Sequence, residues 1–172
     1  MNPAPSVFRQ QLLGAVPRLR RYARSLVFDD AQSDDLVQST LERALTHWQQ
    51  FDQQRDMLVW LLSIAHNAHQ DMRRKQARMQ SMDPTQLQAA QDSLGGDAGV
   101  DVGLRMDLLA ALARLSPEQR EPLLLVCVEQ FSYAEVAEVM HIPVGTVMSR
   151  VCRARATLRG LLDGPAKLRR VV

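Results

Sequence analysis

The chain has 172 residues, of which 46% are hydrophobic, 5% aromatic and 23% charged, and its formal net charge is +2. This length allows one domain or two small ones, and an ordinary apolar content with only 8 glycines excludes a low-complexity chain. The longest apolar run, residues 122–128, is too short to cross a bilayer, and prolines interrupt the N-terminal stretch where a secretory signal needs apolar residues. We therefore expect a cytoplasmic protein that does not insert into a membrane.

Scarce aromatic residues and abundant Leu, Ala, Arg and Gln favour helix over sheet, so the composition predicts an all-α fold. The two cysteines, Cys127 and Cys152, stand alone without metal-ligand spacing. We expect both to be buried, reduced thiols.

Charge is distributed in bands along the chain. Residues 1–28 contain five arginines and no acid, and residues 29–42 contain five acids and no base. Residues 73–78 are basic, residues 83–107 are mostly acidic, and the segment from 144 onward is basic again. A net charge this small is unusual for a protein that binds nucleic acid unaided, but the banding indicates separate surfaces for different partners.

The first helical block predicts a domain over residues 1–80. Residues 8–28 predict either one basic amphipathic helix or a pair of helices that is interrupted at Pro17. Ser33 is the predicted N-cap of the next helix, whose first turn contains Asp34 and Asp35. A further helix begins near Met57, and its polar face comprises Ser63, His66, Asn67, Gln70, Arg73 and Arg74.

Residues 81–103 are rich in helix breakers and acids and predict a flexible linker, with room for one short helix near residues 84–91. The second domain is predicted over residues 104–165, and residues 166–172 form a basic tail. In this domain Ser116 and Pro117 mark a helix start, although Pro122 predicts a kink or a later start.

The end of the second domain has the outline of a helix-turn-helix. Ser132 and Glu135 form a predicted capping box for a short helix that ends near Met140, and the turn at 141–143 precedes a basic helix from Val144. The polar face of this last helix is suited to the major groove of DNA. It comprises Thr146, Ser149, Arg150 and Arg153. The alternative is an ordinary helical hairpin with a solvated basic face.

Three segments together resemble the extracytoplasmic-function sigma factors of bacterial RNA polymerase. "SDDLVQSTLERAL" is similar to the helix of that family that binds the polymerase, and "WLLSIAHNAHQDMRRK" to its W-L-x-x-I-A-R-N-x-x-x-D-x-x-R-R stretch. "LSPEQREPLLL" and the later G-T-V-x-S-R-x-x-R-A-R-x-x-L run resemble its fourth domain. The segments occur in the order of the family and extend over about two thirds of the chain.

The resemblance implies two small helical domains, sigma domain 2 and sigma domain 4, joined by the linker. It implies no catalytic residue, metal or cofactor in this chain. The implied partners are core RNA polymerase, promoter DNA and an anti-sigma factor, and the implied role is transcription initiation for a stress or envelope-response regulon.

Matching the motifs position by position assigns three sets of residues. The resemblance implies that core polymerase binds Asp34, Asp35, Leu36 and Gln38, although the acids would also stabilise a helix N-terminus on their own. It implies that the melted minus-10 strand binds Asn67, Gln70, Arg73, Arg74 and Lys75, which offer amide groups to bases and cations to phosphates. The minus-35 duplex would bind Thr146, Ser149, Arg150 and Arg153.

The sequence departs from the family pattern at His66, where an arginine is common, in the loop before Met57, which lacks a small residue, and at Pro122. A metalloenzyme is a remote alternative, because His66 and His69 are spaced i, i+3 with Asn-Ala and no glutamate between them, and no acid cluster converges on them in the sequence. The stronger alternative is a free-standing helix-turn-helix regulator, which would bind duplex DNA without a polymerase.

Overall fold

The computed structural model describes residues 4–82 and 102–162, and every regular element in these two ranges is a helix. The N-terminal unit consists of α1 (Ser6–Val27), α2 (Asp30–Thr46), the short 3₁₀ helix η1 (Trp48–Gln50) and α3 (Met57–Met82). The C-terminal unit consists of α4 (Val102–Ala113), α5 (Pro117–Cys127), α6 (Tyr133–Met140) and α7 (Val144–Leu162). The all-α prediction with two helical units is confirmed.

Most of the predicted linker, residues 83–101, lies outside the described residues, and so do the short helix expected near 84–91 and the basic tail 166–172. At the two ends of the predicted linker, residues 81–82 belong to α3 and residues 102–103 to α4. The helices therefore extend slightly further than the breaker residues indicate.

In the N-terminal unit the structure selects the single helix at Pro17, and it shows that the helix start predicted at Ser33 is wrong. Helix α1 runs without interruption through Pro17, which lies on its exposed side, where water can bond the carbonyl left without a donor. Helix α2 begins at Asp30, one turn earlier than expected, because the carboxylate of Asp29 accepts a hydrogen bond of 2.7 Å from the backbone N–H of Gln32. Ser33 is buried inside the helix, where its hydroxyl donates to the Asp30 carbonyl.

An aromatic cluster closes the far end of the N-terminal unit. The Phe8 ring of α1 lies 5.7 Å from Phe51 and 6.0 Å from Trp60 between ring centroids, both in edge-to-face geometry. Phe51 and Trp60 are 5.1 Å apart. The cluster ties α1 to the start of α3 and so positions the loop that connects η1 with α3.

The C-terminal unit begins with the helix start predicted at Ser116 and Pro117, although the Ser116 side chain makes no capping hydrogen bond. Helix α5 begins at Pro117 and is continuous through Pro122, which is buried, so the later start given as an alternative is wrong. A single proline costs one backbone hydrogen bond here, and burial of its ring offsets part of that loss.

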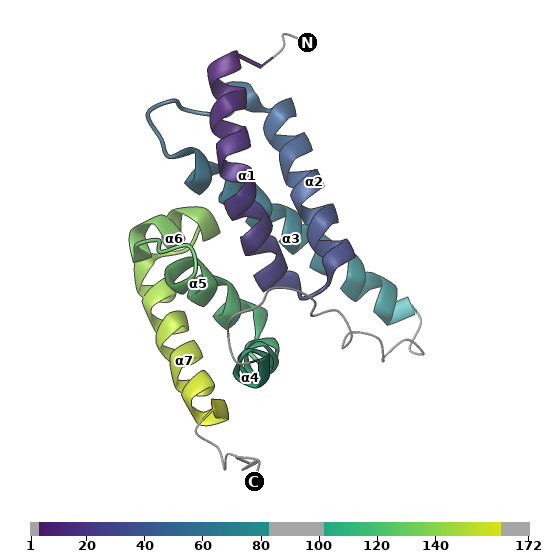
Figure 1. Cartoon of the computed structure of the whole chain (residues 1–172), viewed down its shortest axis with the longest axis vertical. Coiled ribbons are helices and arrows are strands. Elements are labelled where there is room, and N and C mark those ends of the chain that lie inside the picture. The colour runs from purple at the N-terminus through teal and green to yellow at the C-terminus, as the bar shows by residue number, and fades with distance from the viewer. Residues whose placement is uncertain (1–3, 83–101, 163–172) are drawn as a thin grey trace.

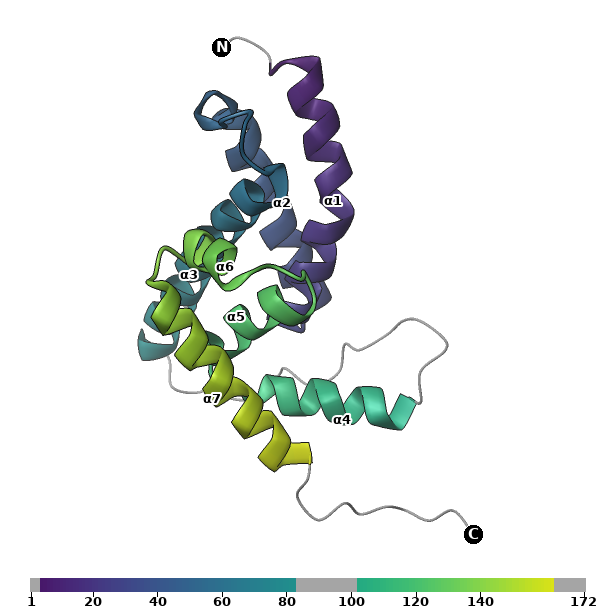
Figure 2. The same ribbon diagram turned by 90° about the vertical axis from the view of Figure 1, so that its left-hand side faces the viewer.

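The two units pack directly against each other. Helix α1 contacts α5 and helix α3 contacts α6, so buried residues of both units form one continuous apolar core. In Figure 1 the C-terminal unit lies below and beside α1–α3, and Figure 2 shows α5 and α6 close to α3 in the perpendicular view. No helix among the described residues is long and apolar enough to cross a membrane.

Candidate binding surfaces

The helix-turn-helix is formed by α6, a three-residue turn and α7. The Ser132 hydroxyl accepts from the backbone N–H of Glu135 while the Glu135 carboxylate accepts from the N–H of Ser132, so the predicted capping box is present in full. His141 ends α6 with a left-handed φ of 54°, and Pro143 then directs the chain into α7. A Cβ added at Gly145 would meet nothing within 4 Å, so the packing of the chain does not require glycine there.

The polar face of α7 is open at two of its four predicted positions. Ser149 and Arg153 are exposed, whereas Thr146 and Arg150 are partly buried. The Arg150 guanidinium lies 3.5 Å from the carboxylate of Glu118 at the start of α5, and its side chain is 22% exposed. On the opposite side of α7, Val147, Val151 and Ala154 are buried, while Val144 and Met148 are exposed.

The five minus-10 candidates follow one another along α3, but their surroundings differ. Asn67, Arg74 and Lys75 are exposed and Gln70 is partly buried. Arg73 lines a cavity between the two units. Asp71, on the same helix, is paired with Arg43 of α2 at 3.1 Å and with Arg74 at 3.8 Å, as expected for a structural acid.

His66 and His69 lie on the side of α3 that the C-terminal unit covers. The His66 ring nitrogen Nδ1 lies 2.7 Å from a carboxylate oxygen of Glu121 on α5, and the same oxygen accepts a 2.6 Å hydrogen bond from the Tyr22 hydroxyl of α1. All three side chains are buried. His66, which the sequence places on the polar face of this helix, is therefore covered by a carboxylate of the chain itself.

Burial shifts the pKa values of two residues at this contact, Tyr22 and His69. Burial raises the pKa of Tyr22 well above its ordinary value, and the charge of Glu121 acts in the same direction. Burial lowers the pKa of His69, whose Nδ1 lies 4.0 Å from the second oxygen of Glu121 and has no hydrogen-bond partner. Tyr22 is therefore a neutral donor at physiological pH, and His69 is held toward its neutral form.

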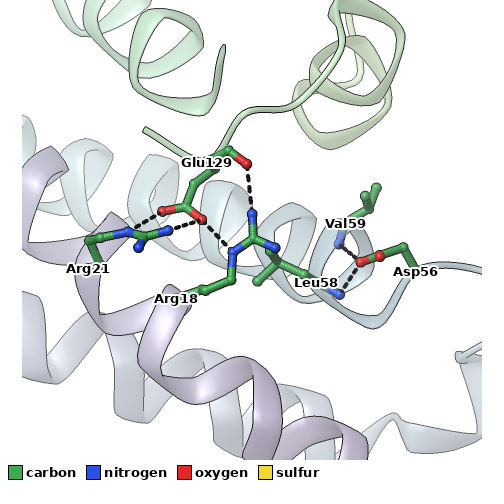
Figure 3. Close-up of polar contacts among 6 residues, drawn as sticks. All are labelled: Arg18, Arg21, Asp56, Leu58, Val59 and Glu129. Carbon is green, nitrogen blue, oxygen red and sulfur yellow. Dashed lines mark hydrogen bonds and ion pairs between the residues drawn. The ribbon is translucent and has the colours of Figure 1, made fainter. Parts of the chain in front are cut away.

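A second buried carboxylate joins α1 to the connection between α5 and α6 (Figure 3). Glu129 accepts from Nε of Arg18 at 2.9 Å and from Nε of Arg21 at 3.0 Å, while the Glu129 side chain has no exposed surface. The Arg18 guanidinium also donates to the Glu129 backbone carbonyl at 2.7 Å and lies over the ring of Phe131. Side chain and backbone of Glu129 are thus both bound by one basic helix.

The loop before α3 is fixed at its end by Asp56, whose carboxylate accepts from the backbone N–H groups of Leu58 and Val59 (Figure 3). Arg55, one residue earlier, forms an ion pair of 2.6 Å with Glu138 of α6. A carboxylate of the helix-turn-helix therefore neutralises a cation beside the predicted minus-10 surface.

The polymerase-binding candidates on α2 divide into exposed and buried residues. Asp34, Asp35 and Gln38 are exposed, and Gln38 donates to Glu42 one turn later. Leu36 has no exposed surface and belongs to the core, so we remove it from the surface set. An i, i+3 or i+4 pattern locates a helix face but does not distinguish a contact residue from a core residue beside it.

The cysteine prediction is wrong with respect to burial. Cys127 and Cys152 are both exposed free thiols, and the Arg155 guanidinium lies 4.0 Å from the Cys127 sulfur. Within residues 4–82 and 102–162, no cluster of three or more His, Cys, Asp or Glu side chains is arranged to hold a metal ion.

Sequence reasoning missed the buried carboxylates Glu121 and Glu129. The available signal was their position on either side of the apolar run 122–128, since acids next to such a run are buried together with it and need cationic or donor partners. Those partners lie about a hundred positions away in α1, at a separation of 99 residues for Tyr22 and 108 for Arg21. No local pattern could have identified them.

Comparisons with known proteins agree with this division into two units. Residues 12–66 match the family described as Sigma2 domain of PhyR, and residues 105–158 match Sigma-70, region 4. The chain is 35% identical over 161 residues to the ECF RNA polymerase sigma factor EcfG of Rhodopseudomonas palustris (strain TIE-1), covering 93% of this chain and 87% of that protein.

Solved structures give the same result. The structure of the sigma factor RpoE in complex with the anti-sigma factor NepR from Bartonella quintana aligns with a TM-score of 0.81 and 32% identity, covering 94% of this chain and 99% of that one. The structure of CnrH in complex with the cytosolic domain of CnrY aligns with a TM-score of 0.66 and 27% identity, over 92% and 89% of the two chains.

Proposed function

Because the chain belongs to the extracytoplasmic-function (ECF) RNA polymerase sigma factors, we propose that it binds core RNA polymerase, recognises the minus-10 and minus-35 elements of promoters and directs transcription initiation. The observation that carries this proposal is the presence of two candidate DNA-reading helices, α3 and α7, in separate units of one chain. A free-standing helix-turn-helix regulator needs only one such helix, the counterpart of α7. We propose that this chain contributes binding and melting, and that the catalytic groups belong to the polymerase.

The minus-35 duplex is assigned to α7. Its exposed Ser149 and Arg153 lie on one face, near the turn that follows α6, which is the end of a recognition helix that enters the major groove. Arg150 joins them once its weak pair with the 70% exposed Glu118 is exchanged for DNA. Thr146, partly buried at the first turn of α7, is placed to contact the phosphate backbone.

The minus-10 strand is assigned to α3 and the loop before it. Asn67 and Gln70 offer amide groups that can bond the edges of unstacked bases, while Arg73, Arg74 and Lys75 offer cations to the phosphates. Core polymerase is assigned to the exposed face of α2, where Asp34, Asp35 and Gln38 project away from the core.

An anti-sigma factor is the proposed regulator of the chain. The aligned RpoE and CnrH structures are complexes, the first with the anti-sigma factor NepR and the second with a cytosolic domain of CnrY. We propose that an anti-sigma factor also binds the present chain. The genes that the chain transcribes are expected to form a stress or envelope-response regulon.

A run-off transcription assay with purified core polymerase and a library of promoters tests the function. We expect transcripts only when the chain and core are both present, because the chain alone has a net charge of +2 and little affinity for duplex DNA. Tight sequence-specific duplex binding by the chain alone, without transcripts from core, would instead favour the free-standing regulator.

A further inference from the structure

A cavity of about 170 Å³ lies where the two units meet. Two arginines line it, and no acidic side chain of the lining balances their positive charges. Its walls come from the end of α1, from α2, from α3 and from α5. The polar lining residues are Gln32, His69, Arg73, Gln76 and Arg120, and the apolar ones are Leu26, Val27 and Met72. No acidic side chain lines the cavity.

The two arginines of this cavity make no ion pair with any side chain among the described residues. Arg73 belongs to α3 and Arg120 to α5, so the two like charges come from opposite units. Burial lowers the pKa of Arg120, and the nearby charge of Arg73 lowers it further. Placing two guanidinium groups together in a partly buried site is unfavourable unless an anion lies between them.

Two buried polar atoms at the cavity also have no hydrogen-bond partner. They are Nε of Arg120 and Nδ1 of His69, and the His69 residue is 6% exposed. Buried polar atoms without a partner are rare in folded proteins, and a bound water or ion is one way to satisfy them. The Arg120 guanidinium lies over the ring of Phe28, 4.8 Å from its centroid, and this contact favours the orientation that faces the cavity.

Glu121, the acid whose charge acts on Arg120, does not balance the two arginines of the cavity. The Glu121 carboxylate is bound by Tyr22 and His66 at 2.6 and 2.7 Å, and its second oxygen is 4.0 Å from His69 Nδ1. Its charge raises the pKa of Arg120, but less than burial and Arg73 lower it. The Glu121 carboxylate, already bound by Tyr22 and His66, is therefore, among the described residues, the one acid near two arginines and His69.

We propose that this cavity binds a small phosphate-like oxyanion, which bridges Arg73 of α3 and Arg120 of α5 and holds the two units together. Arginine binds such anions through paired N–H donors, His69 supplies a further donor, and the amides of Gln32 and Gln76 border the site. The volume is below the range of sites for drug-sized ligands, which fits a single phosphate group better than a whole nucleotide.

Occupation of this site has a consequence that rests on the proposed function. Arg73 is one of the cations assigned to the minus-10 strand. While its guanidinium binds an oxyanion together with Arg120, it cannot also bind a DNA phosphate. The bound anion therefore favours the closed arrangement, in which α5 and α6 pack beside α3, over the open arrangement that promoter binding needs.

The first test measures binding of inorganic phosphate to the full chain by thermal unfolding, against potassium chloride of equal ionic strength. We expect the midpoint to rise by about 3–6 °C when phosphate is at about ten times its dissociation constant. Arg73→Gln and Arg120→Gln should each abolish the specific rise. Arg74→Gln is the matched control, because Arg74 is exposed on the same helix and does not line the cavity.

An equal response in all three variants would overturn the proposal, since it would reduce the effect to general stabilisation of the fold by phosphate. The same holds if potassium chloride reproduces the rise in the unmodified chain. These measurements need neither polymerase nor promoter, so they can fail while the run-off assay succeeds, or succeed while it fails.

The second test asks whether the anion holds the units together and whether its source is free phosphate or DNA. Spin labels on an Arg55→Cys and Glu138→Cys pair, in a chain with Cys127→Ser and Cys152→Ser, couple strongly only when the units are in contact; we call this pair the closure probe. Phosphate should raise the closed fraction in the otherwise unmodified chain and leave it unchanged with Arg120→Gln.

Single-stranded DNA provides the other arm of the second test. If the site serves free oxyanions, Arg120→Gln removes the phosphate response and leaves the affinity of the chain–core complex for minus-10 single-stranded DNA unchanged. If that variant weakens DNA binding as much as Arg73→Gln does, the site belongs to a DNA phosphate and the proposal of a free oxyanion fails.

Discussion

The two candidate reading helices, α3 and α7, are presented differently by the same chain. Ser149 and Arg153 of α7 face outward, and only Arg150 of its predicted set has an acidic partner. Helix α3 has its histidines buried against Glu121, and Arg55 beside it is paired with Glu138. The proposed minus-35 surface is thus exposed in the closed arrangement, whereas the proposed minus-10 surface is partly covered by the other unit. We therefore expect the contact between units to affect binding at the proposed minus-10 surface more than at the proposed minus-35 surface.

The largest expected effect comes from the buried Glu129. Glu129→Lys places a third cation at a fully buried position beside the half-exposed Arg18 and Arg21, which destabilises the contact by about 3 kcal/mol. We expect the closed fraction reported by the closure probe to fall more than tenfold, and amide hydrogen exchange to rise on the covered side of α3 but not along α7.

The matched pair for this change lies on α1 itself. Arg18→Gln with Arg21→Gln should also open the units, while Arg20→Gln with Arg24→Gln should not, because Arg20 and Arg24 are exposed and do not contact Glu129. Equal closure in both double variants would show that apolar packing alone holds the units together. Circular dichroism checks that each variant keeps its helices.

A smaller effect is expected on α7, where Arg153→Ala and Arg150→Ala should each weaken holoenzyme binding to minus-35 duplex DNA by about 1–3 kcal/mol. Affinity for core polymerase should stay the same, and both affinities are measured by fluorescence anisotropy. Glu118→Gln is the control for Arg150, because it breaks the same ion pair without removing the arginine. If Glu118→Gln weakens the DNA complex as much as Arg150→Ala, the arginine acts through the fold and does not read DNA.

A still smaller change is expected at Asn67, which is exposed on α3. Asn67→Ala should alter the preferred base at one minus-10 position by about 1 kcal/mol, since one hydrogen bond to a base edge is lost. Lys75→Ala should weaken all promoters alike, as expected for a phosphate contact. Initiation from a promoter library measures both, and an unaltered preference in the Asn67 variant removes this residue from the reading surface.

Local signals in the sequence were sufficient for most of the fold. The capping box at Ser132 and Glu135 and the start of α7 at Val144 depend on residues within one helical turn, and the structure confirms both. The errors at Leu36 and His66 have a shared cause: the pattern of one helix does not show which of its residues another element covers. The burial of these two residues depends on partners from other elements, as with Glu121 against His66, 55 positions away.

The sequence could predict the part of each candidate surface that lies on a single helix, but not how other helices cover it. The polar faces of α7 and α3 follow from helical spacing. The contact between the units does not, because it pairs acids at 121, 129 and 138 with groups in α1, in α3 and in the loop before α3. A composition that sums to a net charge of +2 conceals this pairing, since the charges that cancel belong to different units.

The smallest expected effect is a pH dependence of closure that comes from His69. Burial lowers its pKa from the ordinary 6.5, and Arg73, Arg120 and His66 act in the same direction, while Glu121 opposes them. The closed arrangement therefore binds a proton at His69 less readily than the open one. Its contribution to closure is complete above pH 6.5 and is lost as the pH falls from there through the lowered pKa.

We expect the closure probe to report a modest fall in the closed fraction between pH 7.5 and 5.5, in about the range where a histidine titrates. His69→Gln keeps a polar side chain but cannot titrate, so it should flatten this part of the profile. Asp71→Asn is the control, because Asp71 is half exposed on the same helix and pairs within the N-terminal unit. If closure instead strengthens on acidification, the lowered pKa of His69 does not govern the contact between the units, and this prediction is wrong.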